Sequence, residues 1–407
     1  MKSNWRTVKL QEIVLFKTGK LDSNAADEQG IYPFFTCSPA TLAINKYAFN
    51  TEAVLLAGNN ANGVFAVKYY NGKFNAYQRT YVITPIDKSV VSVRWLYFRI
   101  KHVTSELQQM SVGTATKFLT KKILDAYEVQ LPPIEEQERQ AKILWDLQNK
   151  LDLNAKTNQT LEQMAKAIFK SWFVDFDPVK AKMNGEQPEG MDAATASLFP
   201  EKLDSETGLP EGWKLSEIGD EVTVVGGGTP SKKSDDFWVD GHIHWTSPKD
   251  LSGVQDKVLL DTASKVTEAG LKKISSGLLP VDTVLLSSRA PVGYLALAKV
   301  PMAINQGYIA MKCEKQLPPE FVIQWCVHRM DEIKQRASGS TFAEISKKSF
   351  KPISVVVPSE DTLNAYQKIV KPLYDAITSN ARQNEQLSSL RDTLLPKLLS
   401  GELSISD

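Results

Sequence analysis

The chain has 407 residues, of which 42% are hydrophobic and 23% charged, a globular composition long enough for two or three domains. Its formal net charge of +1 does not by itself indicate a nucleic-acid binder. The polar first residues do not resemble a signal peptide, and no apolar run approaches the roughly 20 residues that cross a bilayer. With three cysteines and no Cys-x-x-Cys pair, we expect reduced thiols and a cytoplasmic protein without a membrane partner.

The charges are unevenly distributed along the chain. Residues 1–130 carry 16 Lys and Arg against 9 Asp and Glu, and residues 213–357 carry 18 against 16. The remainder is acidic, with 14 against 22. Positive globular parts and negative helical parts would let one face hold a polyanion and another hold a protein. Acidic helices that merely favour solubility explain the same pattern equally well.

Residues 1–130 combine short β-type runs with turn signals. We expect strands at residues 53–57 and 63–67 on either side of an Asn-rich loop, a third strand at 81–84, and a helix over 93–109. This segment is therefore predicted to be a mixed α/β domain.

A long helix is predicted next, from Pro133 to Trp172, within a spacer segment of residues 131–174. Proline is tolerated in the first turn of a helix, and the apolar positions recur in steps of three and four residues, as in a coiled coil. A helix of 40 residues would be roughly 60 Å long. The predicted seam positions are Ile143, Leu147, Leu151, Asn154, Asn158, Leu161, Ala165, Ile168 and Trp172. Residues 175–212 contain four prolines and several glycines, so we expect a linker with little regular structure.

Residues 113–161 recur 226 positions later in the chain without a gap. The repeat indicates two copies of one unit, each ending in a long helix. Two similar modules on one chain are typical of a protein that grips two similar things. Matching residues are Gly113 with Gly339, Pro132 with Pro358, Asn154 with Asn380, Asn158 with Asn384 and Leu161 with Leu387.

Residues 213–357 are predicted to form a second domain like the first. Strands are expected at residues 283–287 and 294–297, and they align with those of the first domain at an offset of 230. The loops between them differ while the strand pattern is kept, which is typical of one scaffold with two different binding loops.

Residues 358–407 are predicted to form a second spacer helix. Pro372 is expected to kink this helix or to split off a short leading segment. The predicted seam positions are Ile369, Leu373, Ile377, Asn380, Asn384, Leu387, Arg391, Leu394 and Leu398.

Two helices with the same seam can pair in an antiparallel way, which would place Asn154 and Asn158 opposite Asn384 and Asn380. Buried Asn lowers stability but fixes register and orientation. Replacing both Asn154 and Asn158 by Leu is therefore expected to loosen the register and raise thermal stability. The alternative is that each helix packs only on its own domain.

Motifs of known catalytic and cofactor sites are missing from the sequence. Residues 226–232 lack the glycine that precedes the lysine of a phosphate-binding loop, and no GxGxxG, HExxH or base-methyltransferase motif occurs. His242 and His244 have no neighbouring cysteine or acidic cluster to complete a metal site. We therefore expect no catalytic residue, no metal and no cofactor on this chain, which favours a binding or scaffolding role.

The run Phe-Lys-Ser-Trp-Phe-Val-Asp-Phe-Asp-Pro-Val-Lys-Ala-Lys at 169–182 continues through Leu-Pro-Glu-Gly-Trp at 209–213. With this run as the most specific match, the chain resembles over nearly its whole length the specificity subunit of type I restriction–modification systems. Residues 131–137 resemble the family's Leu-Pro-Pro-x-x-Glu-Gln start of the spacer helix, and residues 243–251 resemble the scaffold of the second recognition domain. The second helix starts at residues 357–361 with a different pattern, Val-Pro-Ser-Glu-Asp.

The resemblance implies an α+β fold with two similar α/β target recognition domains, separated by two long antiparallel helices that form a coiled-coil spacer with pseudo-two-fold symmetry. Each domain would read one half of a split double-stranded DNA target, and the base pairs between would go unread. The helices would dock two methyltransferase subunits, and restriction or translocase subunits would join them. S-adenosylmethionine, ATP and Mg would bind to those partner subunits only.

Bases are read mainly by Arg, Lys, Asn and Gln, and phosphates are held by Lys, Ser and Thr. In the first domain the candidates are Asn59, Asn60, Asn62, Gln78, Arg79, Thr114, Thr116 and Lys117. In the second domain they are Ser288, Arg289, Gln306, Ser340 and Thr341. The Asn residues can also simply form a turn, and the Gln residues can bind their own domain's backbone. Arg289→Ala is expected to relax the second half-site only.

Two other functions remain open. The chain could carry its own methyltransferase or nuclease activity beside the recognition domains, although no methyl-donor loop is recognisable. It could also be an adaptor whose two domains bind only proteins. Incubation with labelled methyl donor and DNA separates the first alternative, and a gel shift with the partner methyltransferase separates the second.

Overall fold

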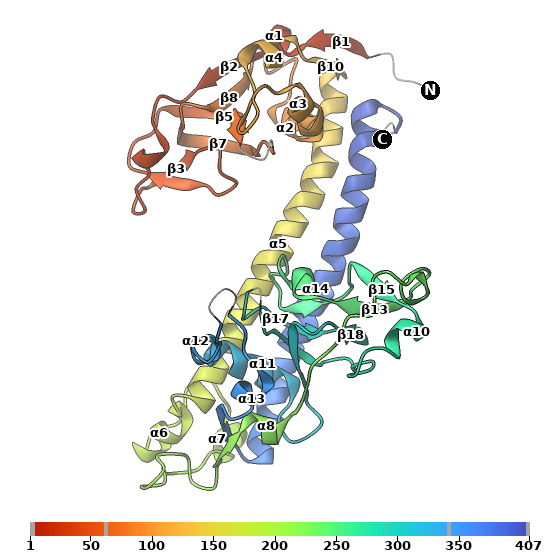
Figure 1. Cartoon of the computed structure of the whole chain (residues 1–407). Coiled ribbons are helices and arrows are strands. Elements are labelled where there is room, and N and C mark those ends of the chain that lie inside the picture. The colour runs from red at the N-terminus through yellow and green to blue at the C-terminus, as the bar shows by residue number, and fades with distance from the viewer. Residues whose placement is uncertain (1–4, 61–63, 290, 340–342, 404–407) are drawn as a thin grey trace. The chain divides into compact units, whose positions relative to one another are not determined.

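The computed structural model describes residues 5–60, 64–289, 291–339 and 343–403. The chain divides into two compact units. Unit 1 consists of residues 1–151 and 386–407, and unit 2 consists of residues 152–385. Because the two long helices cross this division, each unit contains one part of each helix. The units are mixed assemblies of helices and strands (Figure 1).

Unit 1 is built on a six-stranded sheet with strand order β2-β8-β5-β7-β3-β4, and two further strand pairs, β1-β10 and β6-β9, lie outside it. Its strands are β1 (Arg6–Lys9), β2 (Val14–Thr18), β3 (Tyr32–Phe35), β4 (Leu42–Ile44), β5 (Phe49–Ala57), β6 (Asn59–Asn60), β7 (Val67–Ala76), β8 (Thr80–Pro85), β9 (Lys117–Phe118) and β10 (Glu128–Leu131). Its shorter helices are α1 (Leu10–Ile13), the 3-10 turn η1 (Ser23–Ala25), α2 (Val93–His102), α3 (Thr104–Met110) and α4 (Lys121–Ala126).

Helix α2 is the centre of the unit 1 core, and side chains from the sheet and from both long helices pack around it. The Ser92 hydroxyl caps its first turn by accepting from the Trp95 amide. The Trp95 ring is completely buried, and its indole N–H donates to Gln140 at 3.0 Å. This bond fixes α2 on the long helix that follows the domain.

Two predictions in this unit need correction. The strand expected at 63–67 begins only at Val67 and continues to Ala76; Gly63 lies outside the described residues, and residues 64–66 form no strand. The helix expected over 93–109 is interrupted at Val103, which leaves the helical region at φ −91° and ψ 7°. The sequence pattern does not reveal this break, because Leu107 of α3 is an apolar buried position like those of α2.

Unit 2 has a five-stranded sheet with order β12-β19-β16-β17-β14, a three-stranded sheet with order β15-β13-β18, and the pair β11-β20. Its strands are β11 (Lys214–Glu217), β12 (Thr223–Val225), β13 (Ile243–Thr246), β14 (Val258–Leu259), β15 (Ser264–Val266), β16 (Val284–Ser287), β17 (Leu295–Ala298), β18 (Met302–Ile304), β19 (Tyr308–Lys312) and β20 (Ser354–Val357). Its shorter helices are α6 (Asp177–Met183), α7 (Ala193–Ser197), α8 (Ile218–Glu221), the 3-10 turn η2 (Asp235–Phe237), α9 (Pro248–Leu251), α10 (Glu268–Leu271), α11 (Pro319–His328), α12 (Met330–Gln335) and α13 (Lys347–Phe350).

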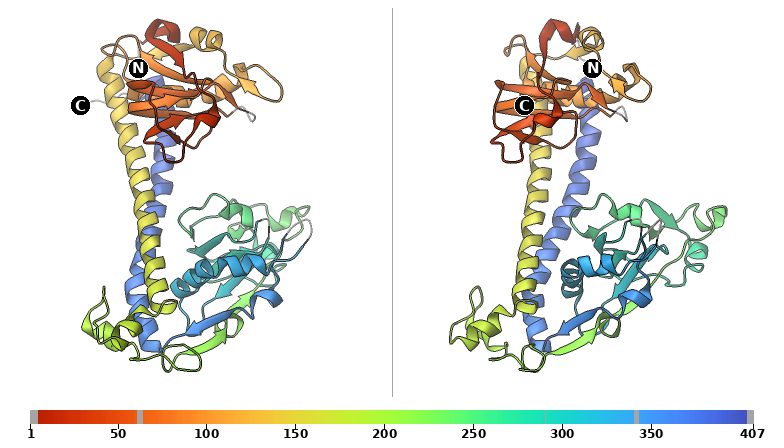
Figure 2. Two further views of the ribbon diagram at one scale, coloured as in Figure 1. Left: turned by 90° about the vertical axis from the view of Figure 1, so that its left-hand side faces the viewer. Right: turned by 60° about the vertical axis from the view of Figure 1, so that its left-hand side comes forward.

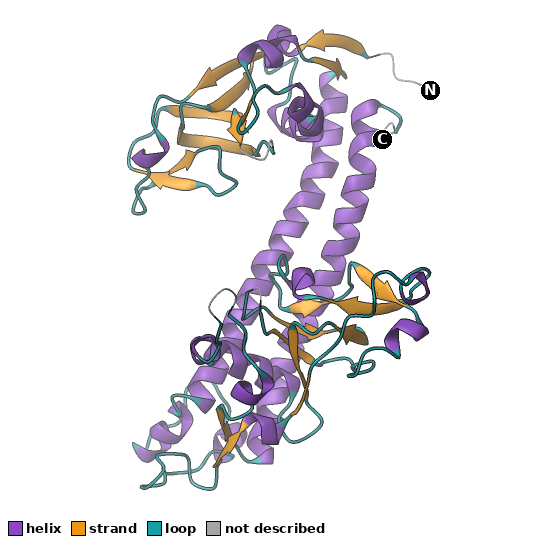
Figure 3. Cartoon of the chain, in the orientation of Figure 1, coloured by secondary structure: helices purple, strands orange, loops and turns teal. Residues whose placement is uncertain are grey.

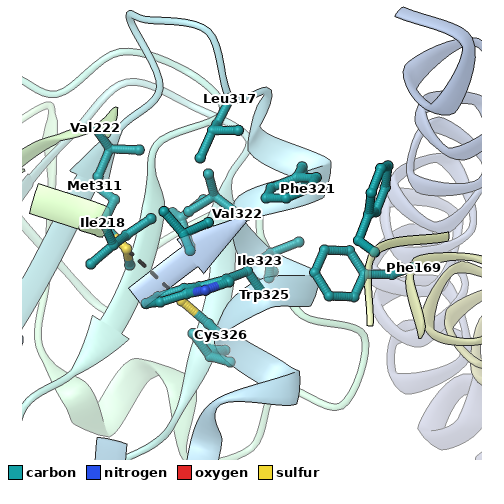
Figure 4. Close-up of a cluster of buried hydrophobic side chains, with 14 of the residues drawn as sticks. Phe169, Ile218, Val222, Met311, Leu317, Phe321, Val322, Ile323, Trp325 and Cys326 are labelled. Atoms are coloured by element: carbon teal, nitrogen blue, oxygen red, sulfur yellow. Dashed lines mark hydrogen bonds between the residues drawn. The ribbon is translucent and has the colours of Figure 1, made fainter. Parts of the chain in front are cut away.

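The unit 2 core repeats the arrangement of unit 1, with α11 in the place of α2. Figure 4 shows Phe321 and Trp325 of α11 in this core, with Met311 of β19 and Phe169 of a long helix nearby. The Phe169 and Phe321 rings meet edge to face, with centroids 5.0 Å apart. The core therefore joins the sheet and the long helices through α11.

The duplicated sequence folds into duplicated structure, here called the first copy (residues 5–131) and the second copy (residues 214–357). Helices α2 and α11 have matching first and last residues at the offset of 226. The pairing of β1 with β10 recurs as that of β11 with β20, so that Lys9 faces Glu128 and Glu217 faces Ser354. The predicted strands at 53–57, 81–84, 283–287 and 294–297 correspond to β5, β8, β16 and β17.

The two long helices are α5 (Ile134–Phe173) and α14 (Glu360–Ser400), and they run side by side in opposite directions within each unit (Figures 1 and 2). In unit 2, Asn154 donates to Asn384 at 2.9 Å and Asn380 donates to Asn158 at 2.8 Å. These are the Asn contacts predicted from the seam. In unit 1, Arg391 donates to Gln148 at 3.0 Å in the same antiparallel register.

The start of α14 differs from the prediction at two positions. Pro372 was expected to kink the helix or to split off a leading segment; the split does not occur, since the helix is continuous from Glu360 to Ser400, and the kink stays a prediction. Proline removes the hydrogen bond to the carbonyl of Lys368, but both residues are exposed, so water can satisfy that carbonyl. Ile369 was predicted in the seam but is 38% exposed, and Val370 is fully buried in its place. Here the helix turns its apolar face to the domain core.

The segment 175–212, predicted to be an irregular linker, is partly helical and packed (Figure 3). Pro178 lies in the first turn of α6, and the Asp192 carboxylate caps α7 by accepting from the Thr195 amide. The Phe199 ring meets the Trp172 ring edge to face at 4.9 Å. The proline and cap signals therefore mark short helices that close over the end of α5.

Candidate nucleic-acid interface

The same backbone hydrogen bonds recur at the ends of equivalent strands in the two copies. In the first copy, the Gly58 amide donates to the Arg79 carbonyl at 2.8 Å, and the Gly58 carbonyl accepts from the Leu119 amide at 2.8 Å. In the second copy, Ser288 makes the equivalent bonds with Gly307 at 2.8 Å and Ile345 at 3.0 Å. The three chain segments that carry most of the predicted DNA contacts therefore meet at one place in each copy.

A second pair of bonds closes the neighbouring loop in both copies. Val112 and Phe118 exchange backbone hydrogen bonds of 3.1 and 2.8 Å. Ser338 and Glu344, 226 residues later, do the same at 3.0 and 2.9 Å. In each copy, backbone bonds that do not depend on side chains thus hold the two ends of this loop against the strand end. We call this shared arrangement the loop frame, and the side chains next to it, such as Asn59 in the first copy and Arg289 in the second, its tip.

In the first copy, the loop frame brings several predicted residues together. Asn59 pairs with Phe118 and Asn60 with Lys117 in the β6-β9 ribbon. The Arg79 guanidinium lies over the Phe118 ring, 5.3 Å from its centre. Thr114 is exposed and Thr116 is half-buried on the same loop. The Asn59 side-chain oxygen is buried and has no hydrogen-bond partner among the described residues.

Gln78 lies at the edge of this group and is exposed. Its side chain donates to Asp22 at 3.3 Å, and its backbone amide donates to Leu21 at 2.9 Å. The backbone bond ties residue 78 to its own domain, while the exposed amide side chain remains at the surface.

In the second copy, Arg289 occupies the place of Asn59 and Glu344 that of Phe118, because the two form a backbone bridge. Their side chains form an ion pair of 3.7 Å. Gln306 is exposed, and its side-chain oxygen accepts from the Thr229 hydroxyl at 2.6 Å. Ser288 must be removed from the candidates: it is only 3% exposed, and its backbone groups maintain the loop frame. Predicted contacts outside the described residues are Asn62, Ser340 and Thr341.

Sequence reasoning missed a polar cavity of about 360 Å³ next to the loop frame of the second copy. Its lining includes Lys249, Ser252, Tyr294 and Asn305 together with Arg289. Lysine and asparagine near a short helix and a strand end are common, so the sequence held no specific signal for this cavity. We call it the Lys249 cavity.

Buried polar groups hold the segment that forms the floor of the Lys249 cavity. The Tyr308 hydroxyl donates to the Ser247 carbonyl at 2.7 Å and lies 3.0 Å from the Thr246 hydroxyl. Burial raises the pKa of Tyr308, so it remains a neutral hydrogen-bond donor. The Asp250 carboxylate accepts from the Ser247 amide and hydroxyl and from the Ala263 amide, which fixes the turn that presents Lys249.

The described residues carry neither a membrane-spanning helix nor a cluster of metal ligands. In this part of the chain, no helix combines the length and apolarity needed to cross a membrane. The same residues contain no group of three or more His, Cys, Asp or Glu side chains placed to hold a metal ion. His242 and His244 instead lie near separate carboxylates, those of Glu268 at 3.7 Å and Asp261 at 3.0 Å.

Comparisons with known proteins agree on one family. The family model described as the type I restriction modification DNA specificity domain matches residues 2–163 and again residues 210–389. The HindI specificity subunit of Haemophilus influenzae is 28% identical over 318 residues, which are 68% of this chain and 69% of that protein. The EcoDI specificity subunit of Escherichia coli is 40% identical over 185 residues, 45% of this chain and 38% of that protein.

A solved structure has the same fold. The S subunit of a type I restriction–modification system from M. genitalium superposes with a TM-score of 0.68 at 17% sequence identity. The match covers 97% of this chain and 96% of that one. At this identity the likeness concerns the fold, with its two sheet-bearing copies and two long helices.

Proposed function

The chain belongs to the family of type I restriction–modification DNA specificity proteins, and on this premise we propose that it reads a bipartite double-stranded DNA target with an unread spacer. Each copy would contact one half-site through the tip of its loop frame. The observation that carries this proposal is the recurrence of the loop frame with different side chains at its tip, Asn59 in one copy and Arg289 in the other. A shared frame with different tips suits two different half-sites.

The antiparallel contacts between α5 and α14 support a spacer role for the helix pair. Buried amide pairs such as Asn154 with Asn384 fix the register, so the length of the pair is a defined quantity. Half-sites roughly 34 Å apart present the same groove to one side of the duplex. A helix pair of fixed register would therefore set the number of unread base pairs.

Catalysis is proposed to lie outside this chain. Two methyltransferase subunits would dock on the helix pair, and restriction or translocase subunits would join that assembly. S-adenosylmethionine, ATP and Mg would bind to those partners. The acidic balance of the residues outside the two domains, 14 Lys and Arg against 22 Asp and Glu, suits a protein partner better than DNA.

Insertion of three heptads into both α5 and α14 tests this function. Twenty-one residues add roughly 31 Å of helix, close to one turn of DNA. Methylome sequencing of cells that express the chain with its methyltransferase partner should then show the same half-sites with a spacer about nine or ten base pairs longer. The matched control carries the insertion in α5 alone, which misaligns the seam and should abolish modification. An unchanged spacer in the double insertion would refute the proposal.

Two alternatives have their own tests. A methyltransferase or nuclease activity of this chain would appear as labelled or cut DNA when the purified chain is incubated alone with methyl donor or Mg. A protein-only adaptor would give no DNA shift even in the presence of the methyltransferase partner.

A further inference from the structure

Two hydrogen-bond donors at the Lys249 cavity, the Asn305 side-chain amide and the Lys249 ammonium, have no partner in the described part of the chain. The Asn305 side-chain oxygen accepts from the Gly307 amide at 2.6 Å, which leaves its NH₂ group for another acceptor. Lys249 is exposed and forms no ion pair with a described residue. The Ser252 hydroxyl donates to the Lys249 carbonyl at 2.8 Å, so it stabilises the turn rather than binding in the cavity.

The nearby carboxylates do not neutralise these donors. Asp250 has both oxygens engaged by groups of its own turn and of Ala263. Among the described residues, Glu344 pairs with Arg289 at 3.7 Å, and both side chains are partly exposed. Water screens a pair of this kind, so it yields easily to a competing acceptor. The cavity therefore suits an anionic group that lies next to a planar group with hydrogen-bond acceptors along its edge.

Gly307 provides the space for this cavity. A Cβ atom at this position would lie 2.9 Å from both the Pro248 ring and the Asn305 side-chain oxygen. The equivalent residue in the first copy is Arg79, whose side chain extends over Phe118. The positively charged side chains therefore differ between the two copies. The first copy has Arg79 over an aromatic ring, and the second has Lys249 and Arg289 around an open cavity.

We infer that, in the second copy, the Lys249 cavity receives a phosphate of the DNA backbone and that Arg289 at its rim reads a neighbouring base edge. Lys249 and the Asn305 amide hold the phosphate, and the parallel N–H groups of the Arg289 guanidinium are suited to O6 and N7 of guanine. Because Gly307 has no side chain, the DNA backbone can enter the cavity, and the ion pair with Glu344 positions Arg289 before DNA binds. This inference rests on the proposed function, because it names the groups that would read the second half-site.

The test uses the full chain in complex with its methyltransferase partner and three DNA duplexes: the methylated target sequence, and the same sequence with the first or the second half-site scrambled. Lys249→Ala should weaken binding to all three duplexes and lower the slope of log K against log salt by about one. Lys272→Ala, at an exposed lysine outside the cavity, is the matched control and should leave binding unchanged.

Arg289→Ala should weaken binding about 5- to 150-fold when the second half-site is intact, and much less when it is scrambled. Arg289→Lys keeps the positive charge but removes the two parallel N–H donors of the guanidinium. This variant should therefore retain non-specific binding and lose discrimination at one base pair. Gly307→Ala narrows the cavity and should weaken binding to all three duplexes, as Lys249→Ala does.

The outcomes separate the inference from the function on which it rests. If the unmodified complex does not distinguish the three duplexes, the proposed function fails. If it does distinguish them while Lys249→Ala keeps the full salt slope, or Arg289→Ala weakens both half-sites equally, only the inference is overturned. Circular dichroism of each variant shows whether the fold is retained, and Arg289→Lys keeps the base-reading claim testable if Arg289→Ala does not fold.

Discussion

The amide pair between Asn154 and Asn384 predicts that one-sided and matched substitutions have opposite effects on stability. Asn154 is 2% exposed and donates to Gln383 at 2.8 Å and to Asn384 at 2.9 Å. Asn384 is half-buried, and Gln383 is exposed. Asn154→Leu alone removes both bonds and leaves the Asn384 oxygen without a partner in the seam. Replacing Asn154 and Asn384 together by Leu also removes the Asn384 oxygen that would otherwise lack a hydrogen-bond partner.

The magnitudes decide the sign of each effect. A fully buried Leu contributes about 1.5–3 kcal/mol relative to an exposed one. Two lost amide hydrogen bonds cost about 1 kcal/mol each, and a stranded buried acceptor costs about 1–3 kcal/mol more. Asn154→Leu should therefore destabilise the helix pair by about 1 kcal/mol. The matched double substitution adds a second, half-buried Leu and should stabilise the pair by about 1–2 kcal/mol.

Asn154→Leu combined with Asn158→Leu is also expected to lower the stability of the helix pair. Both changes lie on α5, so both strand their partners on α14, and Asn158 also loses its bond with Asn380. In addition, a hydrogen bond with Asn158 partly offsets the rise in pKa that burial causes at Asp256, so the substitution removes one partner of this half-buried carboxyl group. The contacts thus predict lower stability for this variant, where the seam pattern alone predicts higher stability.

Amide hydrogen exchange of the α5 peptides around residue 154 is the appropriate assay, because it reports local opening in a chain with several domains. Exchange should be faster than in the unmodified chain for Asn154→Leu and slower for the matched pair. Asn384→Leu alone completes a double-mutant cycle. Equal exchange in the one-sided and matched variants would mean that the two amides are not paired in a desolvated seam.

Three further predictions concern single residues. The buried Gln137 side chain accepts from the Ser92 amide and donates to two backbone carbonyls, so Gln137→Ala should cost about 2–4 kcal/mol, measured as faster exchange in α2. Burial raises the pKa of Glu320 above its unfolded value, so the protonated carboxyl group supports the fold at low pH and its ionisation lowers stability as pH rises above about 4.5. Glu320→Gln should therefore raise the melting temperature at pH 8 and progressively less toward pH 4.5. Gly113 has φ +108°, and a Cβ there would lie 2.1 Å from the Thr116 carbonyl oxygen, so Gly113→Ala should weaken binding to the first half-site only, in gel shifts of the complex.

The repeat and the helix pair were predictable because their signals are long and regular. A constant offset and a seam with steps of three and four fix α5 and α14, and with them the contact of Asn158 with Asn380. The prediction of a seam position was wrong at Ile369, because an apolar pattern does not reveal whether a helix face packs on the other helix or on the domain core. The split expected at Pro372 does not occur, because the carbonyl group that the proline leaves without its helical partner faces solvent.

The candidate interface was predictable in position but not in detail. Asparagines next to a strand end marked the loop that carries Asn59, and the offset carried this position over to Arg289. The burial of Ser288 was not predicted, because a serine next to an arginine gives no sign of which side chain is buried. The Lys249 cavity depends on a short helix, a strand end and the absence of a side chain at Gly307, which come from three separate segments.

The loop frame separates what holds each copy together from what it presents. Its bonds are made by backbone groups of residues such as Gly58 and Ser288, and the buried core lies behind it. Side chains at the tip can therefore differ at little cost to the fold: one copy has a guanidinium over Phe118, and the other has an open cavity beside Gly307. If these side chains read DNA as proposed, exchange of tip residues between copies should change which bases are read more than it changes stability, because the bonds that maintain the fold are made by backbone groups.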